Sequence, residues 1–77
     1  MKTFVSNNLR YLGVVVKYKN KYYRGLLDKD TDKLEWVIGQ PLTSDLNWYV
    51  NKQDLDKEQV PEEVVNKVKN EISKALI

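Results

Sequence analysis

Hydrophobic and polar residues alternate in several short stretches of the first fifty positions, a pattern that predicts β-strands. The longest such region centres on Lys19-Asn20-Lys21 and has runs rich in Val, Leu and Tyr on both sides. A short polar turn containing Asn between two such runs predicts a β-hairpin. We expect its strands over residues 9–18 and 22–27.

The alternation also predicts which face of the hairpin is buried. It sets Leu12, Val14, Val16 and Tyr18 on one face of the first strand, and Tyr11, Gly13, Val15 and Lys17 on the other. The aliphatic set is the expected core face. In the second strand, the charged guanidinium disfavours burial of the face on which Arg24 lies. Tyr23 and Leu27 are therefore expected inside, and Tyr22 and Leu26 outside.

Two further strands are expected over residues 34–38 and 46–50. Leu34, Trp36 and Ile38 are expected to face the core from the first, and Leu46, Trp48 and Val50 from the second. Phe4 and Val5 fit either a short edge strand or an irregular arm. Residues 51–59 are polar apart from Leu55, which predicts a loop with one irregular helical turn.

A C-terminal helix is expected over residues 61–76. Pro61 suits a first helical position, and Glu62 and Glu63 favour the positive end of the helix dipole. The expected buried stripe is apolar at spacings of three and four residues: Val64, Val65, Val68, Ile72, Ala75 and Leu76.

These elements predict one α+β domain over residues 1–77. Its antiparallel sheet would have three or four twisted strands, either open or partly closed like a small SH3-type barrel, with the helix packed on one face.

The chain has no cysteine and no histidine, which excludes disulfides and the usual zinc sites. No signal-like or membrane-spanning run is present, so we expect a cytoplasmic protein. Eleven lysines and seven asparagines among 77 residues are typical of AT-rich genomes, such as those of many bacteria and phages.

The small net charge of +2 hides a strong asymmetry. Residues 1–27 hold six basic residues and no acidic one, whereas residues 28–63 hold ten acidic and four basic residues. Charge separation of this kind concerns partners more than fold.

Catalysis is not indicated by the sequence. Histidine and cysteine, the commonest base and the best nucleophile at neutral pH, are missing. Asp28, Asp30 and Asp32 are spaced like the first ligands of a calcium loop, but Lys33 and Gly39 stand where that loop needs Gly and Glu. We therefore expect a hairpin loop there and predict no metal site. The three glycines are scattered, so no phosphate-binding loop is predicted and no cofactor is expected.

The distinctive feature is the outer face of the hairpin. Its candidate binding residues are basic or aromatic: Tyr11, Lys17, Lys19, Lys21, Tyr22 and Arg24. Lysine and arginine neutralise phosphates, and tyrosine offers a stacking surface to bases, so the set suits nucleic acid. It equally suits a protein interface, or a solvated sheet face on which lysine prevents aggregation.

Apolar residues on the same face keep the protein-interface interpretation open. Val15, Leu26, Val37 and Tyr49 fall there by alternation and would stay uncovered unless sheet closure, the Phe4-Val5 arm, a second copy or a foreign partner hid them. We therefore expect a small non-enzymatic binding protein, acting through the hairpin on a protein partner or by self-association. The alternative is a DNA- or RNA-binding module that uses the same residues.

Overall fold

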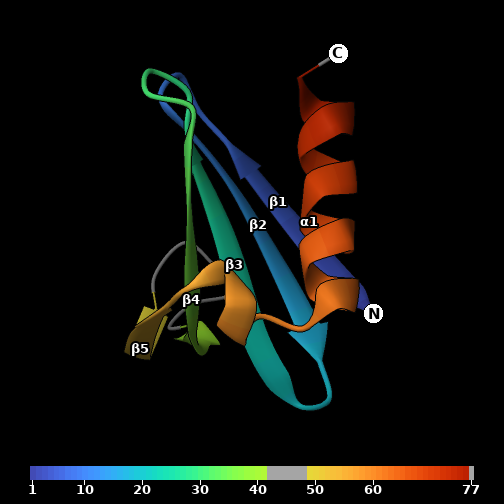
Figure 1. Cartoon of the computed structure of the whole chain (residues 1–77). Coiled ribbons are helices and arrows are strands. Elements are labelled where there is room, and N and C mark those ends of the chain that lie inside the picture. Colours follow the sequence, from blue (N-terminus) through green and yellow to red (C-terminus); the bar gives the residue numbers. More distant parts are fainter. Residues whose placement is uncertain (42–48, 77) are drawn as a thin grey trace.

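Five antiparallel strands form one sheet in the order β1-β2-β3-β4-β5 in the computed structural model of the chain (Figure 1). The structure describes residues 1–41 and 49–76. The strands are β1 (Lys2–Asn7), β2 (Tyr11–Tyr18), β3 (Lys21–Asp28), β4 (Lys33–Pro41) and β5 (Tyr49–Leu55). A 3-10 turn, η1 (Lys57–Gln59), leads into helix α1 (Glu62–Ala75). The predicted α+β class with a C-terminal helix is confirmed.

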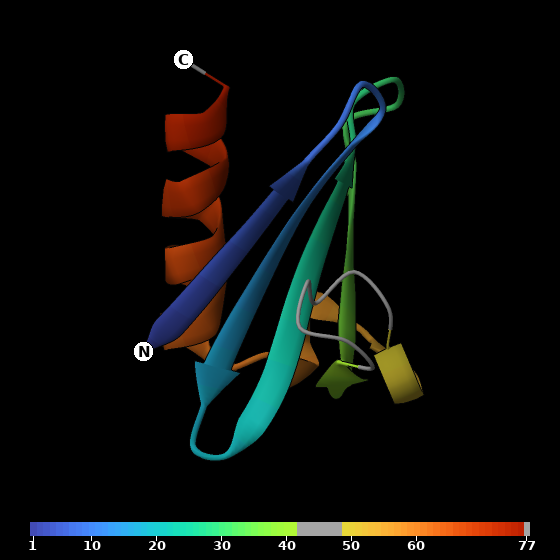
Figure 2. The ribbon, with the colours of Figure 1, turned by 180° about the vertical axis from the view of Figure 1, so that it is seen from behind.

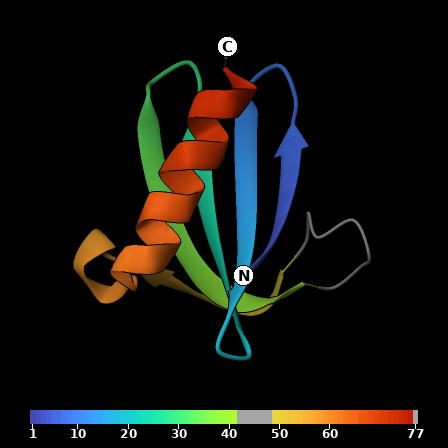
Figure 3. The ribbon, with the colours of Figure 1, turned by 90° about the vertical axis from the view of Figure 1, so that its right-hand side faces the viewer.

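The sheet is open, so the predicted alternative, partial closure into an SH3-like barrel, is wrong. Closure would require the outer strands to pair, but β1 and β5 lie at opposite ends of the strand order. The helix instead lies across β2 and β3 on one face (Figure 3). The apolar face is therefore buried by the helix, and closure of the sheet is not needed.

The central hairpin turns more tightly than predicted. Tyr18 and Lys21 are paired, and the two residues between them, Lys19 and Asn20, both have positive φ (49° and 64°). Positive φ at both central residues defines a type I′ turn, whose twist matches that of the two strands. Lys21 therefore belongs to β3, not to the turn.

The strand before this turn starts at Tyr11, two residues later than predicted. The Asn8 side-chain oxygen accepts hydrogen bonds from the backbone N–H groups of Arg10 (3.0 Å) and Tyr11 (2.7 Å). This local turn directs Leu9 into solvent, where it is fully exposed.

The two outer strands show where hydrophobic patterning fails. The Phe4-Val5 segment forms a regular strand, β1, in unbroken register with β2. The strand predicted over residues 46–50 begins outside the described residues, and β5 runs on to Leu55 through residues expected to form a loop. Val50, predicted to face the core, is 40% exposed. The sheet thus has five strands, not the three or four predicted. The expected irregular turn is present as η1.

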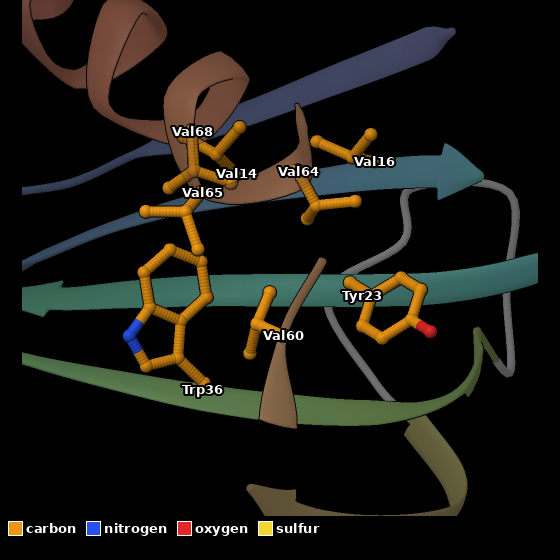
Figure 4. Close-up of a cluster of buried hydrophobic side chains, with 8 residues drawn as sticks. All are labelled: Val14, Val16, Tyr23, Trp36, Val60, Val64, Val65 and Val68. Carbon is orange, nitrogen blue, oxygen red and sulfur yellow. The ribbon is translucent and has the colours of Figure 1, made fainter. Parts of the chain in front are cut away.

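The core lies between the sheet and α1, on the face that alternation predicted (Figure 4). Leu12, Val14 and Val16 are fully buried, and Tyr23 and Trp36 are nearly so. Helix α1 starts one residue after Pro61 and contributes three buried valines. The buried cluster comprises Val14, Val16, Tyr23, Trp36, Val60, Val64, Val65 and Val68. Leu76, predicted to be buried, lies beyond the helix and is 56% exposed.

The face opposite the helix, called the outer face below, is less exposed than predicted. Val15 and Val37 are only 3% and 5% exposed, although no described helix or strand lies over this face (Figure 2). Arg24 stands between them in register, and Phe4 stands beside Val15. Val15 and Val37 therefore leave almost no apolar area uncovered.

Candidate binding surface at the hairpin tip

Four lysines gather around the turn between β2 and β3. Lys2 and Lys17 are register partners on the outer face, Lys19 lies in the turn, and Lys21 pairs with Tyr18. We call these four residues the basic tip. Lys2 joins the group because it is the first residue of strand β1 and lies beside Lys17. The sequence did not show this, because the Phe4-Val5 segment also fitted an irregular arm.

The tip lysines are exposed and rest on aromatic rings. The Lys17 ammonium lies 5.7 Å from the centre of the Tyr22 ring, and that of Lys19 lies 5.3 Å from the Tyr18 ring. Lys2 lies 5.8 Å from the Phe4 ring. Contacts of this kind are worth about 0.5–1 kcal/mol at exposed sites and leave the positive charge accessible.

The basic tip differs from the other charged regions in its lack of acidic partners. Among the described residues, none of its four lysines forms an ion pair with a carboxylate. Four other cations are paired with nearby acids: Arg10, Lys33, Lys67 and Lys74. The ion pairs are Arg10–Asp28 (3.3 Å), Arg10–Asp30 (3.7 Å), Lys33–Glu35 (3.6 Å), Lys67–Glu71 (3.5 Å) and Lys74–Glu71 (3.6 Å). Within the described part of the chain, Lys29, Lys52, Lys57 and Lys69 also lack such a pair, but the four tip lysines are grouped around one turn.

One acidic residue approaches the tip from the helix. Tyr18 donates a hydrogen bond from its hydroxyl to Glu63 Oε2 (3.2 Å), at the first turn of α1. Glu63 thereby ties the tip to the helix N-terminus on the core face. Lys2 and Lys17 stand on the opposite face of the sheet.

The structure brings together only part of the predicted binding set. Lys17 and Tyr22 are direct neighbours across the strands, and Lys19 is adjacent to them in the turn. Lys21 lies by register on the core face, because it pairs with Tyr18. The two-residue turn fixes this orientation.

Tyr11 and Arg24 are also separated from the tip. Tyr11 is six residues from Lys17, about 20 Å along an extended strand, and Arg10 stacks over its ring at 5.1 Å. Arg24 is half-buried and engaged in an interaction of its own. We therefore leave both residues out of the candidate surface.

A cleft of about 550 Å³ opens where β5 leaves the sheet, beside α1 and η1. It is lined by Lys33, Leu34, Glu35, Trp36, Asp54, Leu55, Asp56, Lys57 and Lys69. The nearby Lys57 ammonium lowers the pKa of Lys69 through hydrogen bonding and repulsion. Three lysines and three carboxylates share the rim, so the cleft offers no net attraction to a charged partner.

The three aspartates that resemble part of a calcium loop serve the hairpin between β3 and β4. Asp28 and Asp30 both pair with Arg10, and Asp28 also accepts the Asp30 backbone N–H (3.0 Å). Among the described residues, no group of three or more acidic side chains is placed to hold a metal ion.

Loss of the Arg10 guanidinium is expected to raise the pKa of Asp28. Burial raises the pKa of this carboxyl, but hydrogen bonds from Arg10 and from the Asp30 backbone outweigh burial, so the pKa lies below its ordinary value of 3.8. A carboxyl with a depressed folded-state pKa stabilises the fold above about pH 4, and this contribution disappears as the pH falls through the folded-state pKa. Carboxyl NMR titration of Arg10→Gln should show a higher Asp28 pKa than in the parent. Lys33→Gln, at the same end of the sheet, should leave it unchanged. Identical Asp28 titrations in parent and Arg10→Gln would contradict the assigned cause.

Comparison of the chain with protein-family models, curated proteins and solved structures finds no match. Among the described residues, no helix is long and apolar enough to cross a membrane. The function is accordingly inferred from the chemistry of the basic tip.

Proposed function

We propose that the protein is a small non-enzymatic binding module that holds an acidic segment of a partner protein at its basic tip. The observation that carries this proposal is the clustering of exposed lysines at the tip without carboxylate partners among the described residues, whereas Arg10, Lys33, Lys67 and Lys74 are paired with acids. An acidic partner supplies the missing carboxylates.

The expected energetics are those of a weak, salt-sensitive interaction. Each exposed ion pair contributes about 0.2–1 kcal/mol, so four lysines support modest affinity unless other contacts add to it. Concentrated charge also speeds encounter with a partner of opposite sign. This suits an accessory protein that associates and dissociates readily.

Absence of catalysis remains part of the proposal. The whole chain lacks histidine and cysteine, and the basic tip consists of four lysines, three of which lie over aromatic rings. The nearest carboxylate named above, Glu63, accepts a hydrogen bond from Tyr18. The arrangement supports electrostatic binding, which needs no reacting group.

Nucleic acid is the second candidate, favoured by the juxtaposition of Lys17 and Tyr22 on one sheet face. Single-stranded nucleic acids bind by phosphate neutralisation and by stacking of bases on aromatic rings. Here the ring of Tyr22 is half-buried and lies beneath Lys17, and that of Phe4 is half-buried beneath Lys2. This geometry favours the charge contribution over the stacking contribution, so we place a protein partner first.

The proposal is tested with two labelled probes of similar charge, a ten-residue poly-glutamate peptide and a ten-nucleotide oligo(dT). Fluorescence anisotropy at about 25 mM salt should show binding of the peptide that weakens steeply at about 200 mM, because exposed charges are then screened. Lys17→Glu combined with Lys19→Glu should lower the peptide affinity about tenfold or more, since two attractive contacts become repulsive.

The control carries the same charge change away from the tip. Lys33→Glu combined with Lys74→Glu alters two lysines that are exposed and already paired with acids. Its peptide affinity should fall much less. Equal losses in both variants would show that only net charge matters and would refute a site at the tip. Stronger binding of oligo(dT) than of the peptide would replace the protein partner with nucleic acid.

A further inference from the structure

The two edges of the sheet are protected to different degrees. At one edge, the pairing of β5 with β4 shifts register between Ile38 and Gln40, Asn51 has a positive φ of 53°, and Lys52 and Asp54 add charge. Irregularities and charges of this kind block addition of another strand. At the other edge, β1 has continuous register, no positive φ, and Lys2 as its only charged residue. Edge β1 therefore lacks the features that protect β5.

The hydrogen-bonding pattern shows which groups of β1 are available. The two-residue turn makes Tyr18 and Lys21 a hydrogen-bonded pair, and antiparallel strands alternate bonded and non-bonded pairs. Val14 and Val16 therefore bond to β3, while the residues between them direct their backbone groups toward β1. The backbone N–H of Asn8 donates to the Tyr11 carbonyl (2.9 Å), which agrees with this alternation of bonded and non-bonded pairs.

This alternation of hydrogen bonds leaves three residues of β1 with backbone groups pointing away from the sheet. Lys2, Phe4 and Ser6 face the backbone groups of β2, so Thr3, Val5 and Asn7 direct their own N–H and C=O groups outward. Their side chains share the face that carries the helix, but α1 lies over β2 and β3 and leaves β1 at the border (Figure 3). Val5 is accordingly 47% exposed.

We propose that β1 pairs antiparallel with β1 of a second copy of the chain, with Val5 opposite the partner's Val5. This register joins all three outward-facing residues, because Thr3 then lies opposite the partner's Asn7. Outer and helix-bearing faces remain continuous across the junction. The two sheets become one ten-stranded sheet with both helices on the same side.

The edge itself favours a second copy as the occupant. The register places the half-exposed Val5 side chains against each other and sets each Lys2 opposite Asn8, whose carbonyl oxygen accepts a hydrogen bond from Lys29 Nζ (2.6 Å). The edge is thus complementary to itself in hydrogen bonding and apolar contact. The antiparallel arrangement also sets the two basic tips at opposite ends of the joint sheet, so the dimer presents two binding sites.

The first experiment removes one outward donor without disturbing β2. In Val5→Pro, the lost N–H points away from the sheet, and proline is tolerated on an edge strand in that position. Sedimentation equilibrium should show a concentration-dependent dimer for the parent chain, weakened about tenfold or more in Val5→Pro because two donors are lost per dimer. Val5→Ala keeps the donor and serves as the control, and circular dichroism verifies that each variant is folded.

The second experiment uses the absence of native cysteine to test the register. In Val5→Cys, the twofold arrangement sets the two cysteines about 5.5 Å apart between Cα atoms, within the range of a disulfide. Mild oxidation should give a covalent dimer much faster than for Asn7→Cys, whose partner position is residue 3. A parent chain that stays monomeric at millimolar concentration, or equal cross-linking of the two cysteine variants, would overturn the proposal. Binding of a foreign extended peptide to monomeric β1 would instead assign the edge to another partner.

Discussion

Replacing Gly25 with alanine is expected to lower the free energy of unfolding by about 1–3 kcal/mol, because the added methyl group overfills the core. Gly25 lies on the helix-bearing face of β3, where α1 approaches the sheet closely. A Cβ built there would lie 2.5 Å from Val68 Cγ1 and 3.2 Å from Trp36 Cζ3. Either the helix or the indole must shift to admit it.

Gly13→Ala provides the matched control on the neighbouring strand and the other face. Its Cβ would meet Leu26 Cδ1 at 3.6 Å, which is ordinary contact, and alanine reduces the entropy lost by glycine on folding. Urea denaturation followed by far-UV circular dichroism should give Gly13→Ala a midpoint equal to or above that of the parent. Equal losses in both variants would contradict the close approach of helix and sheet at Gly25.

Trp36→Ala is expected to have the largest effect of any single substitution, about 3–5 kcal/mol. Trp36 is 5% exposed and belongs to the buried cluster, near Val60 and Val65 (Figure 4). A domain of 77 residues has about 4–12 kcal/mol of stability in total. The substitution should therefore remove between about a quarter and all of the stability of the domain.

Two further variants distinguish loss of the indole from loss of the strand. Trp36→Phe keeps an aromatic ring in the cluster and should lose clearly less stability than Trp36→Ala. Glu35→Ala changes the adjacent exposed residue and should alter the free energy of unfolding by no more than about 0.5 kcal/mol. A fully cooperative unfolding transition for Trp36→Ala near the parent's midpoint would show that the core is not centred on this residue.

Strand alternation was sufficient to predict the central strands, because one face of each is buried by a helix. Val14, Val16, Tyr23 and Trp36 all lie on the predicted face. Residues 51–55 of β5 were predicted as a loop because β5 is an outer strand whose residues 50–54 are all exposed, so burial imposes no alternation on them. The hydrophobic pattern also could not predict that the sheet is open, since nothing in local alternation specifies whether the first and last strands meet.

The candidate site was predictable only in part, and the reason is the length of one turn. With the turn taken as Lys19-Asn20-Lys21, Lys21 was predicted on the outer face; this is wrong, because the two-residue turn assigns Lys21 to the core face. Lys17 and Tyr22 were assigned correctly to the outer face because alternation alone fixes them. The absence of acidic partners around the tip depends on tertiary structure, so the sequence showed only the charge asymmetry behind it.

Amide NMR mapping with the poly-glutamate peptide tests the central claim most directly. At low salt, the shifts should concentrate at Lys2, Lys17, Lys19 and Tyr22, and Lys17→Glu combined with Lys19→Glu should abolish them. Shifts spread evenly over lysines throughout the chain, or concentrated around Arg10 and Lys33 at the opposite end of the sheet, would contradict a binding surface at the hairpin tip.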